Sequence, residues 1–235
     1  MFIKPPSWIL LLQCFRRGNN NKWNKNTAAI RYRRCYCVSS QPNNLSLRQQ
    51  RDFLRAVWSS YVQPGDTCID ATCGKGRDSL QMAKLIGPQG FLLACDIQSC
   101  AVEQTEALLR SELDASQCPQ IKMVCASHEL LSEYVKDNSV RLISYNLGYL
   151  PNGDRNIRTT AQTTRNSLER LLPKLCCSGI ISLVCYVGHS GGFEERNEIL
   201  KYVATLPKNL WCVTFHEWIN RSLAPSIVLI EKQPH

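Results

Sequence analysis

The chain has 235 residues, 44% of them hydrophobic, which is enough for one α/β domain with a buried core and too few for two full domains. Its formal net charge of +9 is typical of a nucleic-acid-binding protein, but residues 1–51 hold ten basic and no acidic residues. The rest of the chain has 18 basic and 19 acidic residues, so a strongly basic folded domain is excluded and any RNA-binding surface must be a local patch.

The first forty residues have the composition of an organelle transit peptide, because they contain Arg and Lys without Asp or Glu. The apolar stretch from Trp8 to Leu12 is too short to cross a bilayer, and the absence of a small-residue cleavage site after it disfavours a secretory signal. Many Arg and few Ser favour the mitochondrion over the chloroplast. The alternative is a disordered basic tail that binds acidic surfaces. We expect residues 1–45 to be a transit peptide or disordered, and residues 46–235 to form the folded domain.

Hydrophobic spacing predicts a first helix from Ser46 to Tyr61, which Pro64-Gly65 ends. The predicted strands then cover residues 67–70, 91–95, 121–124, 140–145, 180–187, 210–215 and 227–230, and the predicted helices cover residues 78–86, 101–113, 130–134, 159–172 and 194–206. Strands that are apolar throughout and joined by helices indicate a mostly parallel, seven-stranded, Rossmann-like α/β sheet covered on both faces. Since no long helix separates the last two strands, we expect the last strand to be antiparallel.

The thirteen cysteines are spread along the chain, and most stand in apolar runs. This pattern is typical of free buried thiols, which we expect at Cys68, Cys95, Cys125, Cys185 and Cys212. No Cys-x-x-Cys pair occurs, and no two neighbouring cysteines have a matching second pair at the spacing of zinc ligands. We therefore predict no metal site.

The turn after the first strand reads Asp-Ala-Thr-Cys-Gly-Lys-Gly-Arg-Asp over residues 70–78. Gly74 and Gly76 would let the backbone approach a ligand closely at a helix N-terminus. The sequence lacks the third glycine of a dinucleotide-binding turn and the ending of a P-loop. Asp70 would repel a phosphate but suits the cationic methionyl end of S-adenosylmethionine. The alternative is a tight strand-to-helix connection without a ligand.

Polar residues also follow the next strands of the predicted sheet. Asp96 closes the second strand, twenty residues after Gly76, where an acid reaches ribose hydroxyls in nucleoside-binding folds. His128 follows the third strand and His189 follows the fifth, so either imidazole could line the same pocket. Since ligands of open α/β sheets bind beyond the carboxyl ends of the strands, we expect one site there.

The fourth strand is followed by Asn-Leu-Gly-Tyr-Leu-Pro over residues 146–151. This run resembles the Asn-Pro-Pro-Tyr-type motif of amine-directed methyltransferases, in which the amide oxygen accepts a hydrogen bond from the target amine and the aromatic ring packs on the substrate. Leu-Gly stands here in place of Pro-Pro, so a planar base amino group is a weaker candidate for the target. The alternative is a polar turn in which Tyr149 is half buried.

The motifs taken in order, including Thr159-Thr-x-x-Thr-Thr164 and Tyr186-Val-Gly-His-Ser-Gly-Gly192, resemble the YtqB/MnmM family over about residues 46–232. The resemblance implies a class I methyltransferase fold that uses S-adenosylmethionine. It also implies methylation of the 5-aminomethyl nitrogen of 2-thiouridine at the wobble position of tRNA, giving 5-methylaminomethyl-2-thiouridine. Lys75 and Arg77 stand where the family usually has Asn and His.

The resemblance and the residues together assign the candidate site. Asn146 would orient the amine and Tyr149 would stack on the uracil. Such an amine holds its proton up to roughly pH 10 in water, so the site must favour the neutral form or accept the proton, and Asn146, Tyr149 and His189 are the candidates for this role. The candidate cofactor-binding residues are Asp70, Thr72, Gly74, Gly76, Asp78, Asp96, Gln98, Ser127 and His128. The candidate RNA-binding residues are Arg155, Arg158, Arg165 and Arg170, which flank the substrate loop.

Three other functions stay open on the sequence. The same fold could methylate rRNA, a protein or a small molecule. A non-catalytic RNA-binding protein that retains the fold is disfavoured by the intact Asp70, Gly74, Gly76 and Asp96. A nicotinamide-dependent oxidoreductase is disfavoured by the missing third glycine. The expected partner is the anticodon region of tRNA, no membrane span is predicted, and the sequence is compatible with a homodimer.

Overall fold

The computed structural model describes residues 49–234 except 151–152, 155–156 and 222. These described residues belong to one compact unit. The expected transit segment over residues 1–45 and the expected helix start at Ser46 lie outside the described residues. The first described helix starts at Gln50.

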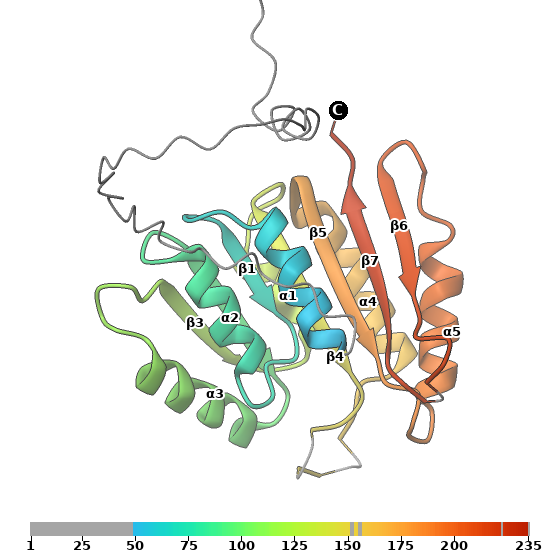
Figure 1. Ribbon diagram of the computed structural model, residues 1–235, viewed down its shortest axis with the longest axis horizontal. Coiled ribbons are helices and arrows are strands. Elements are labelled where there is room, and N and C mark those ends of the chain that lie inside the picture. The colour runs from blue at the N-terminus through green and yellow to red at the C-terminus, as the bar shows by residue number, and fades with distance from the viewer. Residues whose placement is uncertain (1–48, 151–152, 155–156, 222, 235) are drawn as a thin grey trace, which may run out of the picture. The chain divides into compact units, whose positions relative to one another are not determined.

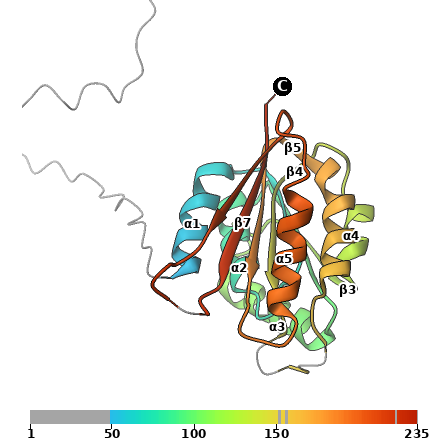
Figure 2. The ribbon, with the colours of Figure 1, turned by 90° about the vertical axis from the view of Figure 1, so that its right-hand side faces the viewer.

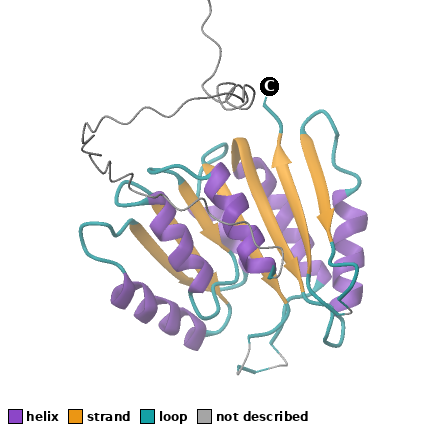
Figure 3. Cartoon of the chain, in the orientation of Figure 1, coloured by secondary structure: helices purple, strands orange, loops and turns teal. Residues whose placement is uncertain are grey.

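The described part alternates strands and helices in the predicted order, and Figure 3 shows the strands side by side between helices. The strands are β1 (Thr67–Asp70), β2 (Phe91–Asp96), β3 (Gln120–Cys125), β4 (Val140–Leu147), β5 (Leu175–Cys185), β6 (Trp211–His216) and β7 (Ser226–Lys232). The α-helices are α1 (Gln50–Tyr61), α2 (Arg77–Ile86), α3 (Ser99–Glu112), α4 (Ala161–Leu171) and α5 (Gly192–Val203), and the 3₁₀ helices are η2 (His128–Tyr134) and η3 (Leu172–Lys174).

The strands form one sheet in the order β3-β2-β1-β4-β5-β7-β6. Neighbouring strands are parallel except at β7, which is antiparallel to both β5 and β6. The connection over residues 217–225 is too short for the helical crossover that a parallel strand requires, so the chain reverses and β7 enters between β5 and β6 (Figure 1). The predicted α/β fold with an antiparallel last strand is therefore confirmed.

Helices cover both faces of the sheet, with α1 and α2 on one side and α4 and α5 on the other (Figure 2). Successive residues of a strand point to opposite faces, so Cys68 of β1 packs in the core under α1, α2 and α3, whereas Ile69 packs in the core under η2, α4 and α5. Trp58 is almost fully buried, and its indole N–H donates to Ser182 Oγ at 3.1 Å, which fixes α1 on β5.

Two strand boundaries differ from the prediction in ways that affect the site. β4 continues two residues further than expected, so Asn146 lies within the strand and has a fixed backbone. β5 starts at Leu175, five residues early, because Leu175 already pairs with Val140. The turn-like residues that follow it lie at an irregularity of the pairing, with Ser178 at a φ of 57° and a register shift between Val140 and Leu142.

The described cysteines are all free thiols, but not all are buried. Cys68, Cys95 and Cys185 lie in the core, as expected, whereas Cys125 and Cys212 are exposed and lie on β3 and β6, the two edge strands of the sheet. Within the described residues, no three side chains of metal-binding types gather closely enough to hold an ion. None of the described helices is both long enough and apolar enough to span a membrane.

Candidate active site

Two adjoining cavities lie beyond the carboxyl ends of the parallel strands, where the sequence predicts a site. The smaller cavity, of about 150 Å³, lies at the ends of β1, β2, β3 and β4. The larger cavity, of about 560 Å³, lies between the start of α1, the ends of β4 and β5, and the β6–β7 connection. The residues common to both linings are Thr72, Gly74, Asn146, Gly148, Tyr149 and Leu150.

Asp96 organises one side of the smaller cavity. Its carboxylate accepts hydrogen bonds from the backbone N–H of Gly74 and from that of Gln98, each at 3.0 Å. These bonds tie the glycine turn after β1 to the start of α3. Each carboxylate oxygen can accept a second hydrogen bond, so Asp96 can still receive hydroxyl groups from a ligand in the cavity.

His128 and Ser127 line the opposite side of the smaller cavity. Ser127 Oγ accepts the backbone N–H of Glu129 and so caps η2. The His128 ring is only 8% exposed, packs edge-on against Tyr145 at 5.8 Å, and has no hydrogen-bond partner for Nε2 among the described residues. Burial lowers the pKa of His128, which favours a neutral ring. Because an unsatisfied buried polar atom costs about 1–3 kcal/mol, this nitrogen suits a polar ligand atom.

Asp70 supports the turn after β1 and lines neither cavity, in contrast to the expected direct contact with a cofactor. The side chain is fully buried and accepts hydrogen bonds from Ser79 Oγ at 2.6 Å and from the backbone N–H of Thr72 at 3.4 Å. Burial, followed by the nearby Asp78 carboxylate, raises the pKa of Asp70 to about 7. Asp70 therefore acts on the site through the turn and through its charge.

Gly76 also lines neither cavity, and its requirement for glycine has a different cause from the expected approach of a cofactor. Its φ of 76° is left-handed, and a Cβ at this position would lie 2.9 Å from Thr105 Cα on α3. Gly74, with a φ of 51°, is the glycine that lines both cavities. The second glycine of the motif thus allows α2 to start against α3.

Asn146 lies in the wall shared by the two cavities, and its side chain has a defined orientation. Its backbone N–H donates to Thr72 Oγ1 at 2.7 Å, and its Nδ2 donates to Asp78 Oδ2 at 2.8 Å. An ionised carboxylate can only accept, so the amide must present its nitrogen to Asp78. The amide oxygen Oδ1 has no donor among the described residues and is left as an acceptor for a ligand.

Tyr149 and His189 face each other at the larger cavity. Their rings are 5.6 Å apart and nearly perpendicular, and Tyr149 is 36% exposed. His189 Nδ1 lies 3.1 Å from the carbonyl oxygen of Ser190, which can only accept, so Nδ1 carries the hydrogen. Nε2 is then a lone-pair acceptor, and it is buried without a hydrogen-bond partner in the described part of the chain.

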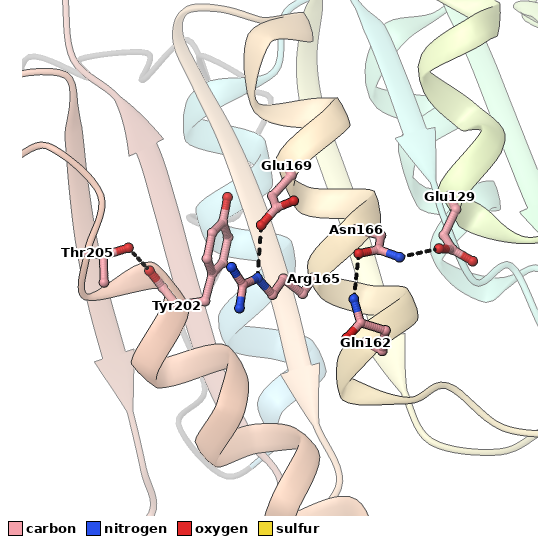
Figure 4. A network of polar contacts seen from close by, with 7 residues as sticks. All are labelled: Glu129, Gln162, Arg165, Asn166, Glu169, Tyr202 and Thr205. Carbon is pink, nitrogen blue, oxygen red and sulfur yellow. Dashed lines mark hydrogen bonds and ion pairs between the residues drawn. The ribbon is translucent and has the colours of Figure 1, made fainter.

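The structure separates the four arginines that were predicted to bind RNA. Arg155 lies outside the described residues. Arg165 pairs with Glu169 at 2.9 Å and lies over the ring of Tyr202 on the outer surface of α4 (Figure 4), and Arg170 donates to the backbone carbonyl of Glu129. Neither side chain lines a cavity. Arg158 does line the smaller cavity, where it donates to the backbone carbonyl of Ser190 at 3.0 Å.

Three basic residues that the prediction omitted line the larger cavity instead: Arg51, Lys75 and Arg77. All three are exposed, and none forms an ion pair or side-chain hydrogen bond with the described residues. Lys75 and Arg77 could have been identified, because they are the two departures from the family pattern in the first motif. Arg51 could not, because only the packing of α1 on β5 brings the helix start to this edge.

Of the other predicted cofactor residues, Thr72 lines both cavities and Gln98 lines the smaller one. Asp78 lines the larger cavity, where it holds the amide of Asn146. The structure thus brings together most of the residues predicted from the five strand ends. The exceptions are Asp70, Gly76 and the two arginines of α4.

Comparison with known proteins identifies related sequences. A sequence profile described as Putative rRNA methylase matches residues 92–232. A protein of Arabidopsis thaliana, named tRNA (mnm(5)s(2)U34)-methyltransferase, chloroplastic, is 36% identical over 192 residues, which are 79% of this chain and 70% of that protein.

Solved structures share the fold. The crystal structure of a putative rRNA-methylase from Clostridium thermocellum superposes with a TM-score of 0.75 at 31% identity and covers 80% of this chain and all of that one. A putative methyltransferase from Streptococcus mutans, solved in complex with SAH, has a TM-score of 0.69 at 23% identity and covers 80% of this chain and 99% of its own. The second likeness concerns the fold alone.

We expect Asp70→Asn to change how stability depends on pH. The pKa of Asp70 is raised from 3.8 to about 7, so between these values the unfolded chain releases the Asp70 proton while the folded chain keeps it, and the wild type loses stability as pH rises. The neutral amide avoids that loss. The free energy of unfolding of the variant, relative to the wild type, should therefore rise by roughly 2–3 kcal/mol between pH 5 and pH 8 in urea denaturation. An equal difference at both pH values would contradict the raised pKa.

Proposed function

This chain belongs to the Putative rRNA methylase family, as its resemblance to the YtqB/MnmM group predicted, and we propose that it is a tRNA methyltransferase. The methyl donor is S-adenosylmethionine, and the proposed acceptor is the 5-aminomethyl nitrogen of a wobble 2-thiouridine, which becomes 5-methylaminomethyl-2-thiouridine. One observation carries the proposal. A smaller cavity lined by Asp96 and His128 adjoins a larger cavity in which Asn146, Tyr149 and His189 offer contacts for an amine on an aromatic base.

The residues of the smaller cavity fit the nucleoside part of the cofactor. Asp96 would hold the ribose hydroxyls, and the unpaired Nε2 of His128 would meet a polar atom of the base. Thr72 and Gly74 continue the wall toward the larger cavity, where the methionyl part would extend. When bound, S-adenosylmethionine supplies a methyl group made electrophilic by the sulfonium. The protein's task is then to align the accepting nitrogen with that methyl group.

The residues of the larger cavity suit an alkylamine. Such an amine is protonated at neutral pH, and its nitrogen becomes a nucleophile only after losing that proton. His189 Nε2 can take the proton, because Nδ1 already carries one and Nε2 is free. Asn146 Oδ1 can then accept a remaining N–H of the amine and direct the nitrogen lone pair, while Tyr149 packs on the uracil ring.

Phosphates of the anticodon loop would bind the basic side chains at the rim of the larger cavity. Lys75 and Arg77 stand at the N-terminus of α2, where the helix dipole is positive and cations are unfavourable unless an anion binds there. Arg51 lies at the same rim from α1. The folded part carries nearly equal numbers of acidic and basic residues, so its net charge would not attract RNA. Arg51, Lys75 and Arg77 would instead form a local basic patch.

We expect Arg77→Ala to weaken tRNA binding and to reduce its salt dependence, since one phosphate contact is lost. The slope of log affinity against log salt should fall by about 1, measured by filter binding at several salt concentrations. Arg165→Ala is the matched control, because Arg165 is already paired on α4, and it should leave affinity and slope unchanged. If Arg77→Ala weakens cofactor binding instead, the rim holds the cofactor carboxylate and not RNA.

We expect Asp96→Ala and Asn146→Ala to separate cofactor binding from methyl transfer. Loss of Asp96 removes charged hydrogen bonds, so calorimetry should show cofactor affinity falling about ten- to hundredfold. Loss of Asn146 should leave that affinity nearly unchanged while transfer to tRNA bearing the aminomethyl group falls at least about a hundredfold. Normal transfer by Asn146→Ala would reject its role. Transfer by the wild type to rRNA but not to this tRNA would reject the proposed substrate.

The chain is proposed to act in an organelle. The basic, acid-free composition of residues 1–51 supports this, as does the similarity to a protein named chloroplastic. The composition favours the mitochondrion among organelles.

A fluorescent fusion of residues 1–45 should therefore enter mitochondria, because an Arg-rich, acid-free segment has the composition that mitochondrial import requires. Co-localisation with a mitochondrial dye measures this. Fluorescence in plastids would support organelle targeting but reject the mitochondrion as the destination. A diffuse cytosolic signal would reject organelle targeting altogether.

A further inference from the structure

Glu195 is a buried acid that the proposed reaction does not use. It lies in the first turn of α5 and is only 4% exposed. Its two carboxylate oxygens accept hydrogen bonds from Thr159 Oγ1 and Thr164 Oγ1, each at 2.9 Å. Burial raises the pKa of Glu195, while the two hydroxyl groups, His189 and Arg158 act in the opposite direction. Burying a carboxylate costs free energy, which suggests that Glu195 and its two hydrogen bonds have a function in the site.

Thr159 connects Glu195 to the loop that carries Tyr149. Its Oγ1 accepts the backbone N–H of Gly148 at 2.8 Å, and its own N–H donates to the Gly148 carbonyl at 2.9 Å. The next residues along the loop, Tyr149 and Arg158, form an antiparallel bridge with each other. A chain of hydrogen bonds therefore runs from Glu195 through Thr159 to the residue before Tyr149.

The start of α5 also fixes the turn that carries His189. The backbone N–H of Glu195 donates to the Gly191 carbonyl at 2.9 Å, and that of Gly192 donates to the His189 carbonyl at 3.1 Å. The imidazole is held closely between two glycines, because a Cβ at Gly148 would lie 3.2 Å from His189 Nε2 and a Cβ at Gly192 would lie 2.8 Å from it. A small shift of the Gly148 backbone would therefore displace the ring.

We infer that Glu195 is a positioning residue for methyl transfer, which holds Gly148 through Thr159 and so sets Tyr149 and His189 against each other at the larger cavity. This inference rests on the proposed function, because methyl transfer is its readout. Gly148, Tyr149 and Thr159 also line the smaller cavity, but the two groups proposed to hold the nucleoside there, Asp96 on β2 and His128 after β3, are positioned by other elements. Loss of the Glu195 contact should therefore lower kcat by a much larger factor than it lowers cofactor affinity.

The two threonines provide a matched pair of variants. Thr159→Val and Thr164→Val each remove one hydroxyl group that donates to Glu195 and keep the branched shape, but Thr159 also holds Gly148. We expect Thr159→Val to lower kcat at least about tenfold and cofactor affinity less than about threefold, because misplacement of reacting groups is costly. Thr164→Val should lower kcat less than about threefold. Equal losses in the two variants would overturn the inference.

A second measurement does not depend on the substrate. Hydrogen exchange of the peptide that contains Gly148 should become faster in Thr159→Val and stay unchanged in Thr164→Val, because the first variant alone removes the acceptor of that amide. Unchanged exchange in Thr159→Val would overturn the inference even if activity falls. If the wild type fails to methylate tRNA while exchange responds as expected, the proposed function fails and the positioning of Gly148 stands.

Glu195→Gln separates position from charge. The amide keeps the shape and can make both contacts, because its oxygen accepts from Thr159 and its nitrogen donates to Thr164. We expect Glu195→Gln to retain kcat within about threefold, whereas Glu195→Ala should lose as much as Thr159→Val. If Glu195→Gln is as inactive as Glu195→Ala while the Gly148 amide remains protected, the carboxylate acts through its charge and the positioning role is rejected.

Discussion

The site depends on the hydrogen bond between the Asn146 amide and the Asp78 carboxylate. This bond joins the end of β4 to the start of α2, and the bond from the Asn146 backbone to Thr72 closes the same gap at the turn after β1. Together they form part of the wall that the two cavities share, while Asp96 and His128 line the smaller cavity elsewhere. Because Asp78 cannot donate, the contact also decides that the amide oxygen is the group presented to a ligand.

In the site, acidic side chains lie deeper than basic ones, although the folded part of the chain is nearly neutral. The acids of the site, Asp70, Asp78 and Asp96, lie beneath or within the cavity walls, and the bases Arg51, Lys75 and Arg77 lie at the rim. Burial and, after it, the nearby Asp78 carboxylate raise the pKa of Asp70, and a positively charged ligand would offset the repulsion between these acids. A sulfonium or an ammonium group suits the interior, whereas phosphates suit the rim. The proposed reaction brings both kinds of group to one site.

The order of strands and helices could be predicted from the sequence, because hydrophobic runs and turn residues mark each element and parallel strands end at one edge. The ends of β1 to β5 accordingly supply the site. Spacing did not show which way each side chain points. Asp70 and Gly76 belong to the predicted motif yet face the core and α3, and Arg165 of α4 is paired on the outer surface. Glu195 lies outside the predicted motifs, since only the packing of α5 against α4 brings it to Thr159.

The turn over residues 70–78 explains how one short segment can serve two ligands. Its residues alternate in direction: Asp70 and Gly76 face inward, Thr72 and Gly74 form the shared wall, and Lys75 and Arg77 extend to the rim. Lys75 and Arg77, which stand where the resemblance leads us to expect Asn and His, both line the larger cavity and neither lines the smaller one. Substitution there leaves the backbone and the carboxylates that would hold the cofactor intact. Under the proposed function, the basic side chains that would meet RNA can thus vary without any change in the groups that would hold the cofactor.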